Sequence, residues 1–374
     1  MALQLTQEQK AAGWQIKQIR EIATVVTGGT PSKNNPEHWG DNTPFLTPSD
    51  QVFGVRQAIT SRFLSVEGKE PFSRRMVDSG AVAITCIGAT IGKASYVQVP
   101  TVTNQQINSL VADEKQAHGL YLYYLFTTLP EELYAISSGS AKPIVSKSVL
   151  ENFEVAIPSY AEQKGIAEIL GSMDDKIEAN SRLLNSLSEL GSALMRREIS
   201  ASITTAPLSE IAEITMGQSP AGDSLNEEGE GAIFYQGRCD FGFRYPTQRV
   251  YTTAPTRIVD EGDILLSVRA PVGDLNRTDK ACCVGHGVAA IRAKDGNTSQ
   301  LFYLLKESPQ LWEPFEGEGT IFSSINRKQL HKLSVPLISQ NAEYENIEEN
   351  IKSLTIENKI LADTRDFLIR HLIG

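Results

Sequence analysis

The residues of this chain that could do chemistry do not assemble into a known catalytic motif. Residues 88–93, Gly-Ala-Thr-Ile-Gly-Lys, imitate a nucleotide-binding P-loop. Three residues rather than four separate the glycines, however, and Ala94 follows the lysine, so we expect no ATP binding. Cys282, Cys283 and His286 are metal-ligating types, but adjacent cysteines lack the spacing of a zinc site and favour a packed strand and turn. GxGxxG after a strand, HExxH and Asp/Asn-Pro-Pro-aromatic motifs are also missing from the sequence.

Several loops instead combine small residues, amides and cations, which is the chemistry of nucleic-acid contact. A Gly-rich turn lets backbone N–H groups approach a phosphate, Arg or Lys reaches a phosphate or a base edge, and Asn or Gln can bind adenine through two hydrogen bonds. Polar-cation pairs at 146–147 and 326–327 follow small-residue loops at 138–142 and 317–320 and open expected helices, a place suited to phosphate contact. The candidate DNA contacts in the first half are Thr27, Gly28, Gly29, Thr30, Lys93, Asn104, Gln105, Lys142, Ser146 and Lys147. Those in the second half are Gly217, Gln218, Ser219, Arg238, Arg244, Arg269, His286, Asn326 and Arg327.

These candidates have structural alternatives. The Gly-rich turns at 27–32 and 216–220 can be simple tight turns, and Phe243 and Tyr245 can belong to a core. Arg238 and Arg244 have no apolar reason to be buried, so we expect both to be exposed.

The segments that would position these loops occur in two similar copies along the chain. Residues 21–23 and 210–212 both read Glu-Ile-Ala, and each tripeptide leads through a glycine to a proline at the same spacing. Val-Asp-Ser-Gly at 77–80 corresponds to Val-Asp-Glu-Gly at 259–262. A period near 181 residues is far longer than the roughly 20–50 residues of a solenoid repeat. Each copy is therefore expected to be a complete domain followed by a helix.

Within each copy, short β-rich runs alternate with Gly, Pro, Ser and Asn. The pattern predicts strands at 80–87, 95–99, 262–268 and 288–292, and short helices at 119–128 and 299–307. Each copy is thus expected to be a mixed α/β unit dominated by a twisted or partly closed antiparallel sheet.

A long helix is expected after each copy, because apolar residues there recur at alternating steps of four and three, as in a coiled coil. The predicted seam of the first helix contains Ile166, Leu170, Met173, Ile177, Asn180, Leu184, Leu187 and Leu194. That of the second contains Ile347, Ile351, Leu354, Asn358, Leu361 and Leu368, with Arg365 also on the stepping. We expect the helices to pair antiparallel, with Asn180 and Asn358 fixing their register. Two amphipathic helices on separate domains are the alternative.

Composition describes a globular protein of 374 residues with 41% hydrophobic side chains, enough for two cores. No apolar run approaches a membrane span, and the N-terminus is polar, so we expect a cytoplasmic protein. The four cysteines form no CxxC pair and are expected to be small buried residues. A formal charge of −10 argues against a protein that simply coats nucleic acid.

The order of these features resembles the DNA-specificity subunit of type I restriction-modification systems. The resemblance rests on Glu-Ile-Ala to Gly-x-Ser/Thr-Pro, the Gly-rich turn, the steps at 146–147 and 326–327, and a Pro-bounded strand leading into a heptad helix, all duplicated. It covers essentially the whole chain. It implies an α+β fold in which two mixed α/β target-recognition domains with β-rich cores, residues 1–158 and 201–338, are separated by an antiparallel coiled coil of helices at 159–200 and 339–374.

The resemblance also implies a division of labour. Each domain would read one half of a split, asymmetric DNA target, and two adenine-N6 methyltransferase subunits would dock on the scaffold, joined by a motor-nuclease subunit. S-adenosylmethionine, and ATP with magnesium, would belong to those partners, leaving this chain without a cofactor or metal. Because Asp41–Gln51 and Tyr235–Tyr245 differ in composition, the two half-sites are expected to differ.

Two other functions are compatible with parts of the sequence. A coiled-coil scaffold without DNA recognition of its own would suit the acidic balance, and it predicts no specific duplex binding even with a methyltransferase present. An enzyme acting at a cleft between two domains would need an acid-base or nucleophile set, which the chain does not offer.

Overall fold

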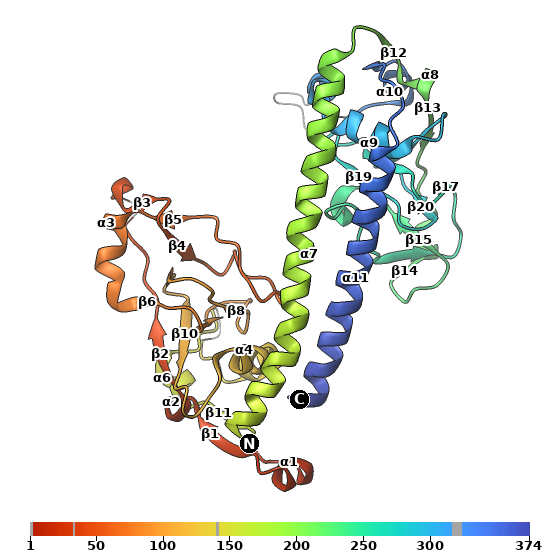
Figure 1. The fold of residues 1–374 in the computed structure, drawn as a ribbon. Coiled ribbons are helices and arrows are strands. Elements are labelled where there is room, and N and C mark those ends of the chain that lie inside the picture. Colours follow the sequence, from red (N-terminus) through yellow and green to blue (C-terminus); the bar gives the residue numbers. More distant parts are fainter. Residues whose placement is uncertain (1–2, 33, 140–141, 316–323) are drawn as a thin grey trace. The chain divides into compact units, whose positions relative to one another are not determined.

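The structure is a computed structural model that describes residues 3–32, 34–139, 142–315 and 324–374. It divides into two units: unit 1 extends to Glu178 and includes Asn358–Gly374, and unit 2 is Ala179–Glu357. The long helices α7 (Tyr160–Ala201) and α11 (Glu343–Leu372) each contribute one part to each unit (Figure 1).

Unit 1 is built from a four-stranded antiparallel sheet in the order β2-β10-β7-β8, a five-stranded sheet β3-β5-β4-β9-β6 and a β1-β11 pair. The strands are β1 (Gln15–Gln18), β2 (Ala23–Thr27), β3 (Trp39–Gly40), β4 (Thr43–Leu46), β5 (Phe63–Leu64), β6 (Met76–Val77), β7 (Val82–Thr85), β8 (Ala94–Tyr96), β9 (Thr101–Thr103), β10 (Ile107–Ala112) and β11 (Glu154–Ile157). The helices are α1 (Gln7–Ala11), α2 (Ile19–Ile22), η1 (Pro36–His38), α3 (Val66–Lys69), η2 (Glu70–Arg75), α4 (Gly119–Thr127), α5 (Pro130–Ala135) and α6 (Lys147–Glu151).

Unit 2 repeats this topology with sheets β13-β21-β18-β19, β14-β16-β15-β20-β17 and β12-β22. The strands are β12 (Thr205–Pro207), β13 (Ala212–Met216), β14 (Leu225–Asn226), β15 (Ala232–Tyr235), β16 (Val250–Thr252), β17 (Ile258–Val259), β18 (Ile264–Ser267), β19 (Leu275–Arg277), β20 (Cys282–Val284), β21 (Val288–Ala293) and β22 (Ser334–Pro336). The helices are α8 (Leu208–Ile211), η3 (Gly222–Ser224), η4 (Arg238–Asp240), α9 (Thr298–Lys306), η5 (Pro309–Leu311), η6 (Glu313–Phe315) and α10 (Arg327–His331). The duplication predicted from the sequence is confirmed at the level of strand order.

The five-stranded sheets are mixed rather than antiparallel throughout. In each, one parallel pair joins segments that are distant in the chain, β4 with β9 and β15 with β20. The expected predominance of antiparallel pairing is confirmed, and the two parallel pairs are an addition that the sequence did not indicate, because period and turn signals are local.

Strand β7 shows how the layers of unit 1 are formed. Val82 and Ile84 face a core that contains α4 and parts of both long helices, whereas Ala83 faces a second core shared with the five-stranded sheet. Strand β18 is arranged in the same way in unit 2, with Ile264 and Leu266 on one side and Leu265 on the other. Because both faces of these strands are covered, they read as continuous apolar runs rather than alternating ones.

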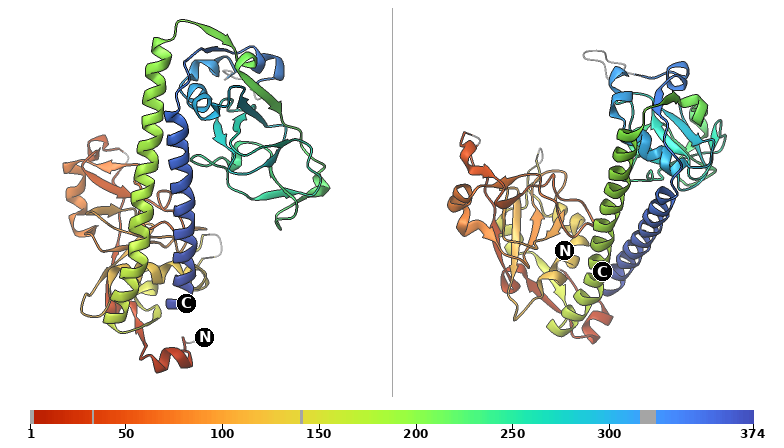
Figure 2. Two further views of the ribbon diagram at one scale, coloured as in Figure 1. Left: turned by 45° about the vertical axis from the view of Figure 1, so that its right-hand side comes forward. Right: turned by 45° about the horizontal axis from the view of Figure 1, so that its top comes forward.

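The two long helices run antiparallel. In unit 1 the beginning of α7, at Ile166 and Leu170, shares its core with Ile369 near the end of α11. In unit 2 the end of α7, at Met195, shares its core with Ile347 near the beginning of α11. Each is an unbroken helix (Figure 2), and at 1.5 Å per residue the 42 residues of α7 span about 63 Å.

The predicted seam positions are withdrawn from solvent to different degrees. Asn180 is buried and donates a hydrogen bond of 2.8 Å to Glu357 of α11, while its expected meeting with Asn358 stays a prediction. The buried apolar members of the predicted seam are Ile166, Leu170, Leu184, Ile347 and Ile351. The half-buried members are Met173, Ile177, Leu187, Leu194, Leu354, Asn358, Leu361 and Leu368.

Candidate nucleic-acid interface

In unit 1 the sequence-predicted contact loops meet at one end of the four-stranded sheet. Strand β10 begins there, at Ile107, and lies between the ends of β2 and β7. The backbone N–H of Asn104 donates to Leu46 at the end of β4, and Ile87 forms a β-bridge with Ile144. We call this set of loops, residues 27–32, 46–51, 86–93, 103–107, 138–139 and 142–146, loop cluster 1.

The Gly-rich turn of loop cluster 1 is closed by the protein itself. The N–H groups of Gly28 and Gly29 donate to the carbonyls of Ile107 and Thr103, at 3.2 and 2.8 Å. A Cβ at Gly28 would lie 2.2 Å from the Thr103 carbonyl oxygen, so glycine is needed for the close approach. In unit 2 the N–H groups of Gly217 and Gln218 are used in the same way. These segments are therefore simple tight turns, the alternative given above, and their backbone N–H groups are not available to bind a phosphate.

The side chains around this turn are also linked to one another. Thr30 donates to the side-chain oxygen of Gln105, and Thr27 donates to Asn108 at 2.7 Å. The side-chain oxygen of Asn104 accepts from the N–H of Gln106 at 2.7 Å, and this bond does not use the side-chain nitrogen of Asn104. Thr30, Asn104 and Gln105 thus form a contiguous polar group at the surface of loop cluster 1.

Lys93 lies in loop cluster 1 but is partly committed to the protein. Its ammonium donates to the backbone carbonyl of Gln51 at 2.9 Å and lies 5.8 Å from the centre of the Phe53 ring. The Gln51 amide is itself fully buried and hydrogen-bonds Ala83 and Thr85. Lys93 therefore holds the 46–51 loop against β7, which is a structural role beside any contact with DNA.

Unit 2 has an equivalent set of loops, residues 216–220, 235–238, 267–274, 284–288 and 324–327, which we call loop cluster 2. His286 and Ser219 exchange hydrogen bonds, with their side chains 2.8 Å apart, and Ser219 donates to Gln236 at 2.7 Å. Arg238 is exposed as expected but forms an ion pair with Asp274. Arg269 is exposed, and its backbone forms a β-bridge with Ser324.

The two polar-cation steps do open helices, as predicted. Ser146 caps α6 by accepting from the N–H of Val149 at 3.3 Å, and Asn326 caps α10 by accepting from Gln329 at 3.1 Å. The caps occupy these two side chains, so the adjacent cations are the better candidates for phosphate contact. Lys147, Arg327 and Lys142 are all exposed, although Lys147 is 3.6 Å from Glu151. Of the preceding loops, 140–141 and 317–320 lie outside the described residues.

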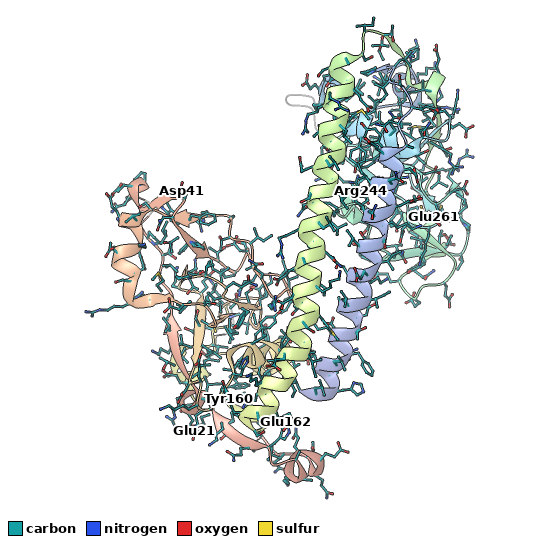
Figure 3. All side chains as sticks on the ribbon, in the orientation of Figure 1. Glu21, Asp41, Tyr160, Glu162, Arg244 and Glu261 are labelled. Atoms are coloured by element: carbon teal, nitrogen blue, oxygen red, sulfur yellow. The ribbon has the colours of Figure 1, made fainter. Side chains whose placement is uncertain are left out.

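Arg244 is not an exposed contact, and its expected role is corrected. Only 2% of its side chain is accessible, and Figure 3 shows it beside α11. Its guanidinium lies 3.4 Å from the Glu348 carboxylate of α11 and donates to Ser188 of α7 at 3.1 Å. Arg277 approaches the same carboxylate at 3.0 Å, and Tyr303 donates to it at 2.9 Å. Arg244 therefore ties its loop to the helices of unit 2 and is dropped from the proposed DNA contacts.

An equivalent arginine in unit 1 was missed in the sequence. The backbone carbonyls of Arg56 and Arg244 accept from corresponding residues at the ends of β8 and β19, which shows that the two positions match. Arg56 is buried and lies 2.6 Å from Asp175 and 2.9 Å from Glu178, both on α7.

A second buried ion pair in unit 1 joins the two long helices, Arg365 of α11 with Asp174 of α7. Tyr124 of α4 donates to Asp174 at 2.6 Å, and burial followed by this carboxylate raises the pKa of the phenol, so it stays a donor. The sequence indicated this ion pair only through Arg365, a charged residue at a position of the heptad pattern where an apolar residue is expected.

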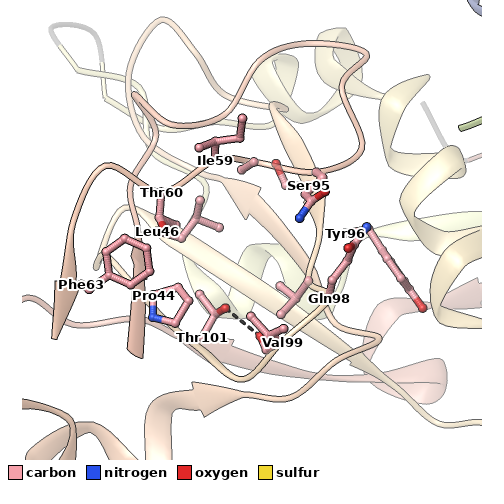
Figure 4. Close-up of a pocket in the computed structure, with 13 residues that line it drawn as sticks. Pro44, Leu46, Ile59, Thr60, Phe63, Ser95, Tyr96, Gln98, Val99 and Thr101 are labelled. Carbon is pink, nitrogen blue, oxygen red and sulfur yellow. Dashed lines mark hydrogen bonds between the residues drawn. The ribbon is translucent and has the colours of Figure 1, made fainter. Parts of the chain in front are cut away.

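The hollow of unit 1 drawn in Figure 4 is lined by apolar and uncharged polar side chains. This hollow, of about 240 Å³, is lined by residues such as Pro44, Ile59, Phe63 and Val99 (Figure 4), with no Asp, Glu, Lys, Arg or His among its described lining residues. Across the described part of the chain, no group of three or more His, Cys, Asp or Glu is placed to hold a metal ion. Among these same residues, no helix combines the length and hydropathy of a membrane span.

Three of the four cysteines are buried, as expected. Burial raises the pKa of the Cys86 thiol to about 11 and that of Cys282 to about 12, so both are protonated and unreactive at neutral pH. Cys239 is exposed, which corrects the expectation for that residue.

Comparison with known proteins agrees with this architecture. A protein from Methanocaldococcus jannaschii, named as the specificity subunit of the type I restriction enzyme MjaX, is 28% identical over 356 residues, 87% of this chain and 83% of that protein. The HindI specificity subunit of Haemophilus influenzae is 30% identical over 51% of this chain and 42% of its own length. The type I S subunit from M. genitalium has the same fold, with a TM-score of 0.67 and 15% identity over 100% of this chain and 98% of that one.

The family model described as the type I restriction modification DNA specificity domain matches twice, at residues 11–189 and 203–363. The two matches follow the internal duplication and together include nearly all of the chain. The chain therefore belongs to the type I restriction-modification DNA specificity family, whose members are non-catalytic subunits of these systems.

Proposed function

We propose that each recognition domain of this chain, residues 1–158 and 201–338, reads one half of a bipartite and asymmetric DNA target. The observation that carries this proposal is the pair of loop clusters, which stand at the same end of the same sheet in two units of identical strand order. Side chains at such sites discriminate bases in the major groove, while cations on phosphates fix the position of the domain.

The side chains at equivalent positions support two different half-sites. Where loop cluster 1 presents Gln105 beside Thr30, loop cluster 2 presents His286 beside Ser219. Lys93 of the first cluster corresponds to Asp274 of the second, which pairs with Arg238. Because these groups differ in charge and in hydrogen-bonding pattern, the two clusters would favour different base edges.

The decisive experiment is long-read mapping of methylated adenines in cells that carry this protein with its methyltransferase subunit. A two-part, non-palindromic motif with a constant spacer is the expected result. Methylation without a sequence preference would instead favour the scaffold function, in which the chain recruits partners but does not read DNA.

We also propose that α7 and α11 set the spacing between the half-sites. Each helix is continuous through the boundary between the units, at Glu178 in α7 and Asn358 in α11. Inserting four residues, about one helical turn, at that point in both helices should change the number of base pairs in the spacer or prevent assembly. Methylation mapping of the variant measures this; an insertion of four residues at 228–229, in the exposed loop after β14, is the control that should leave the spacer unchanged. An unchanged spacer in the helix variant, with assembly intact, would contradict the spacing role.

The helices further carry exposed apolar side chains that we propose as docking points for the methyltransferase subunits. On the part of α7 in unit 2, Leu183 and Leu190 are 47% and 50% exposed and lie seven residues apart, on one face of the helix. On the part of α11 in unit 1, Ile360 and Phe367 have the same spacing and are 59% and 51% exposed. Apolar residues repeated along one exposed helix face are typical of a surface that binds another helix.

Replacing both Leu183 and Leu190 by Glu should weaken methyltransferase binding by at least about tenfold, since two leucines lose roughly 1.5–3 kcal/mol each of potential burial. Pull-down or calorimetric titration with the methyltransferase subunit measures the loss. Asn185→Glu adds a charge at an exposed position between them, on another face, and should bind normally. Equal binding by all three proteins would rule out this surface.

A further inference from the structure

The Gly-rich turns use their own backbone N–H groups within the protein, so other groups would have to bind a DNA phosphate near them. The backbone N–H groups of Gly28, Gly29, Gly217 and Gln218 are all donated to protein carbonyls. A phosphate at either turn would therefore have to be bound by side chains. The strand that lies beside the turn in each unit brings such a side chain.

That strand is β6 in unit 1 and β17 in unit 2, the last strand of each five-stranded sheet. The residue immediately before it is an arginine in both copies, Arg75 and Arg257. Their separation of 182 residues equals that of Val77 and Val259, which pair with β9 and β20 in the same way, so the arginines are equivalent by sequence and by register.

Contacts place the side chain of Arg75 and the backbone of Arg257 beside the turn. In unit 1 the Arg75 guanidinium donates to the Gly28 carbonyl at 3.4 Å, and it lies 2.8 Å from the position that a Cβ on Gly29 would take. In unit 2 Thr256, the neighbour of Arg257, donates to the carbonyl of Gln218, and the carbonyl of Arg257 accepts from Val284 at 3.0 Å. Each arginine is thus held by its strand next to the first residues after β2 or β13.

Their charges are available for a ligand. Arg75 and Arg257 are exposed, and neither forms an ion pair with any residue that the structure describes. By contrast, Arg238 is paired with Asp274, and the half-buried Arg292 is paired with Asp260 and Asp263. A single weak hydrogen bond to a carbonyl leaves most of the five N–H donors of Arg75 unused.

We propose that Arg75 and Arg257 bind the DNA phosphate backbone and fix the position of each domain without reading sequence. The two units differ at their base-reading candidates, yet both have an exposed arginine at this equivalent position beside the turn. A group common to both half-sites, whatever their sequences, is the phosphate. Guanidinium and phosphate are matched in charge and in geometry. The inference rests on the proposed function, because it assumes that the loop clusters face the duplex.

The test is a salt titration of duplex binding by the full chain in complex with its methyltransferase. Arg75→Ala and Arg257→Ala should each reduce the magnitude of the negative slope of log affinity against log salt concentration by about one. Each should also weaken binding to cognate and to half-scrambled duplexes by the same factor. Arg75→Lys and Arg257→Lys should restore most of the slope. Arg20→Ala removes an equal charge in α2, just before the opposite end of β2, and should behave as the parent complex.

The outcomes separate this inference from the function on which it rests. An unchanged slope in both alanine variants, with melting temperatures equal to that of the parent, overturns the inference. A loss confined to one base pair of the target also overturns it, because that result identifies a base contact. A parent complex that binds DNA without preferring any sequence contradicts the proposed function, while a lower slope in the variants would still support phosphate binding.

Discussion

Gly217→Ala is expected to impair reading of the second half-site while the first is still read. A Cβ at this position would lie 2.1 Å from the Gly285 carbonyl oxygen and 2.7 Å from that of Val288. Both are backbone atoms of the segment that carries His286, so the turn and that segment must move apart. Overpacking of this kind costs about 1–3 kcal/mol, roughly a 5- to 150-fold loss in binding at the affected half-site.

The duplication supplies a mirror experiment. Gly28→Ala places a Cβ 2.2 Å from the Thr103 carbonyl oxygen in unit 1, so it should affect the first half-site alone. Gly222→Ala is the matched control within unit 2, since a Cβ there meets no atom within 4 Å. Mapping methylated adenines for the three variants measures each half-site separately. Equal fidelity at both half-sites in Gly28→Ala and Gly217→Ala would remove the turns from the reading surface.

The sequence was most informative where the signal is local or repeated. The repeat predicted two similar units, and the predicted strand at 288–292 is β21, Val288–Ala293. The alternating steps of four and three residues predicted α7 and α11, because residues at this spacing lie on one face of a helix and can be buried together. The loops around Gly28, Asn104 and Lys93 do meet, since antiparallel neighbours in a sheet bring alternate strand ends together.

The sequence was least informative where a side chain's partner is distant in the chain. Arg244 lies among aromatic residues in an irregular segment, and its carboxylate partner Glu348 is on α11, so only the fold shows that the charge is buried. The direction of backbone N–H groups is likewise invisible in a Gly-rich motif. Gly28 is needed for a close approach of two protein segments, which is a different use of glycine from a phosphate cradle with the same sequence.

The buried charges also explain how the segments next to the two loop clusters are held. Loops that are to discriminate bases, as proposed, have to keep their positions to within a fraction of an ångström, although the strands that flank them are only two to six residues long. Arg56 in unit 1 and Arg244 in unit 2 connect the segments that follow residues 46–51 and 235–238 to carboxylates on the long helices α7 and α11. An ion pair is directional, so it fixes the loop more narrowly than apolar contacts of equal area.

Glu348→Ala is accordingly expected to destabilise unit 2 by about 3–5 kcal/mol. Its side chain is 3% exposed and serves both Arg244 and Arg277, whose side chains are 2% and 8% exposed. Without the carboxylate, two guanidinium groups would remain in the interior with no opposite charge, and Tyr303 would lose the acceptor of its hydroxyl. Thermal unfolding of the full chain, followed by calorimetry, measures the effect as a lowered melting transition for unit 2.

Glu349→Ala is the matched control, because it removes the neighbouring carboxylate of α11, which is exposed, and should change stability by less than about 0.5 kcal/mol. Glu348→Gln keeps the shape of the side chain and one acceptor oxygen, so it should fall between the two. If Glu348→Ala had the same melting temperature as the control Glu349→Ala, the interaction of the Glu348 carboxylate with Arg244 and Arg277 would contribute no net stability. The loop that carries Arg244 would then have to be held by the packing of its aromatic neighbours Phe302 and Tyr303, whose rings lie 4.3 and 5.3 Å from the guanidinium.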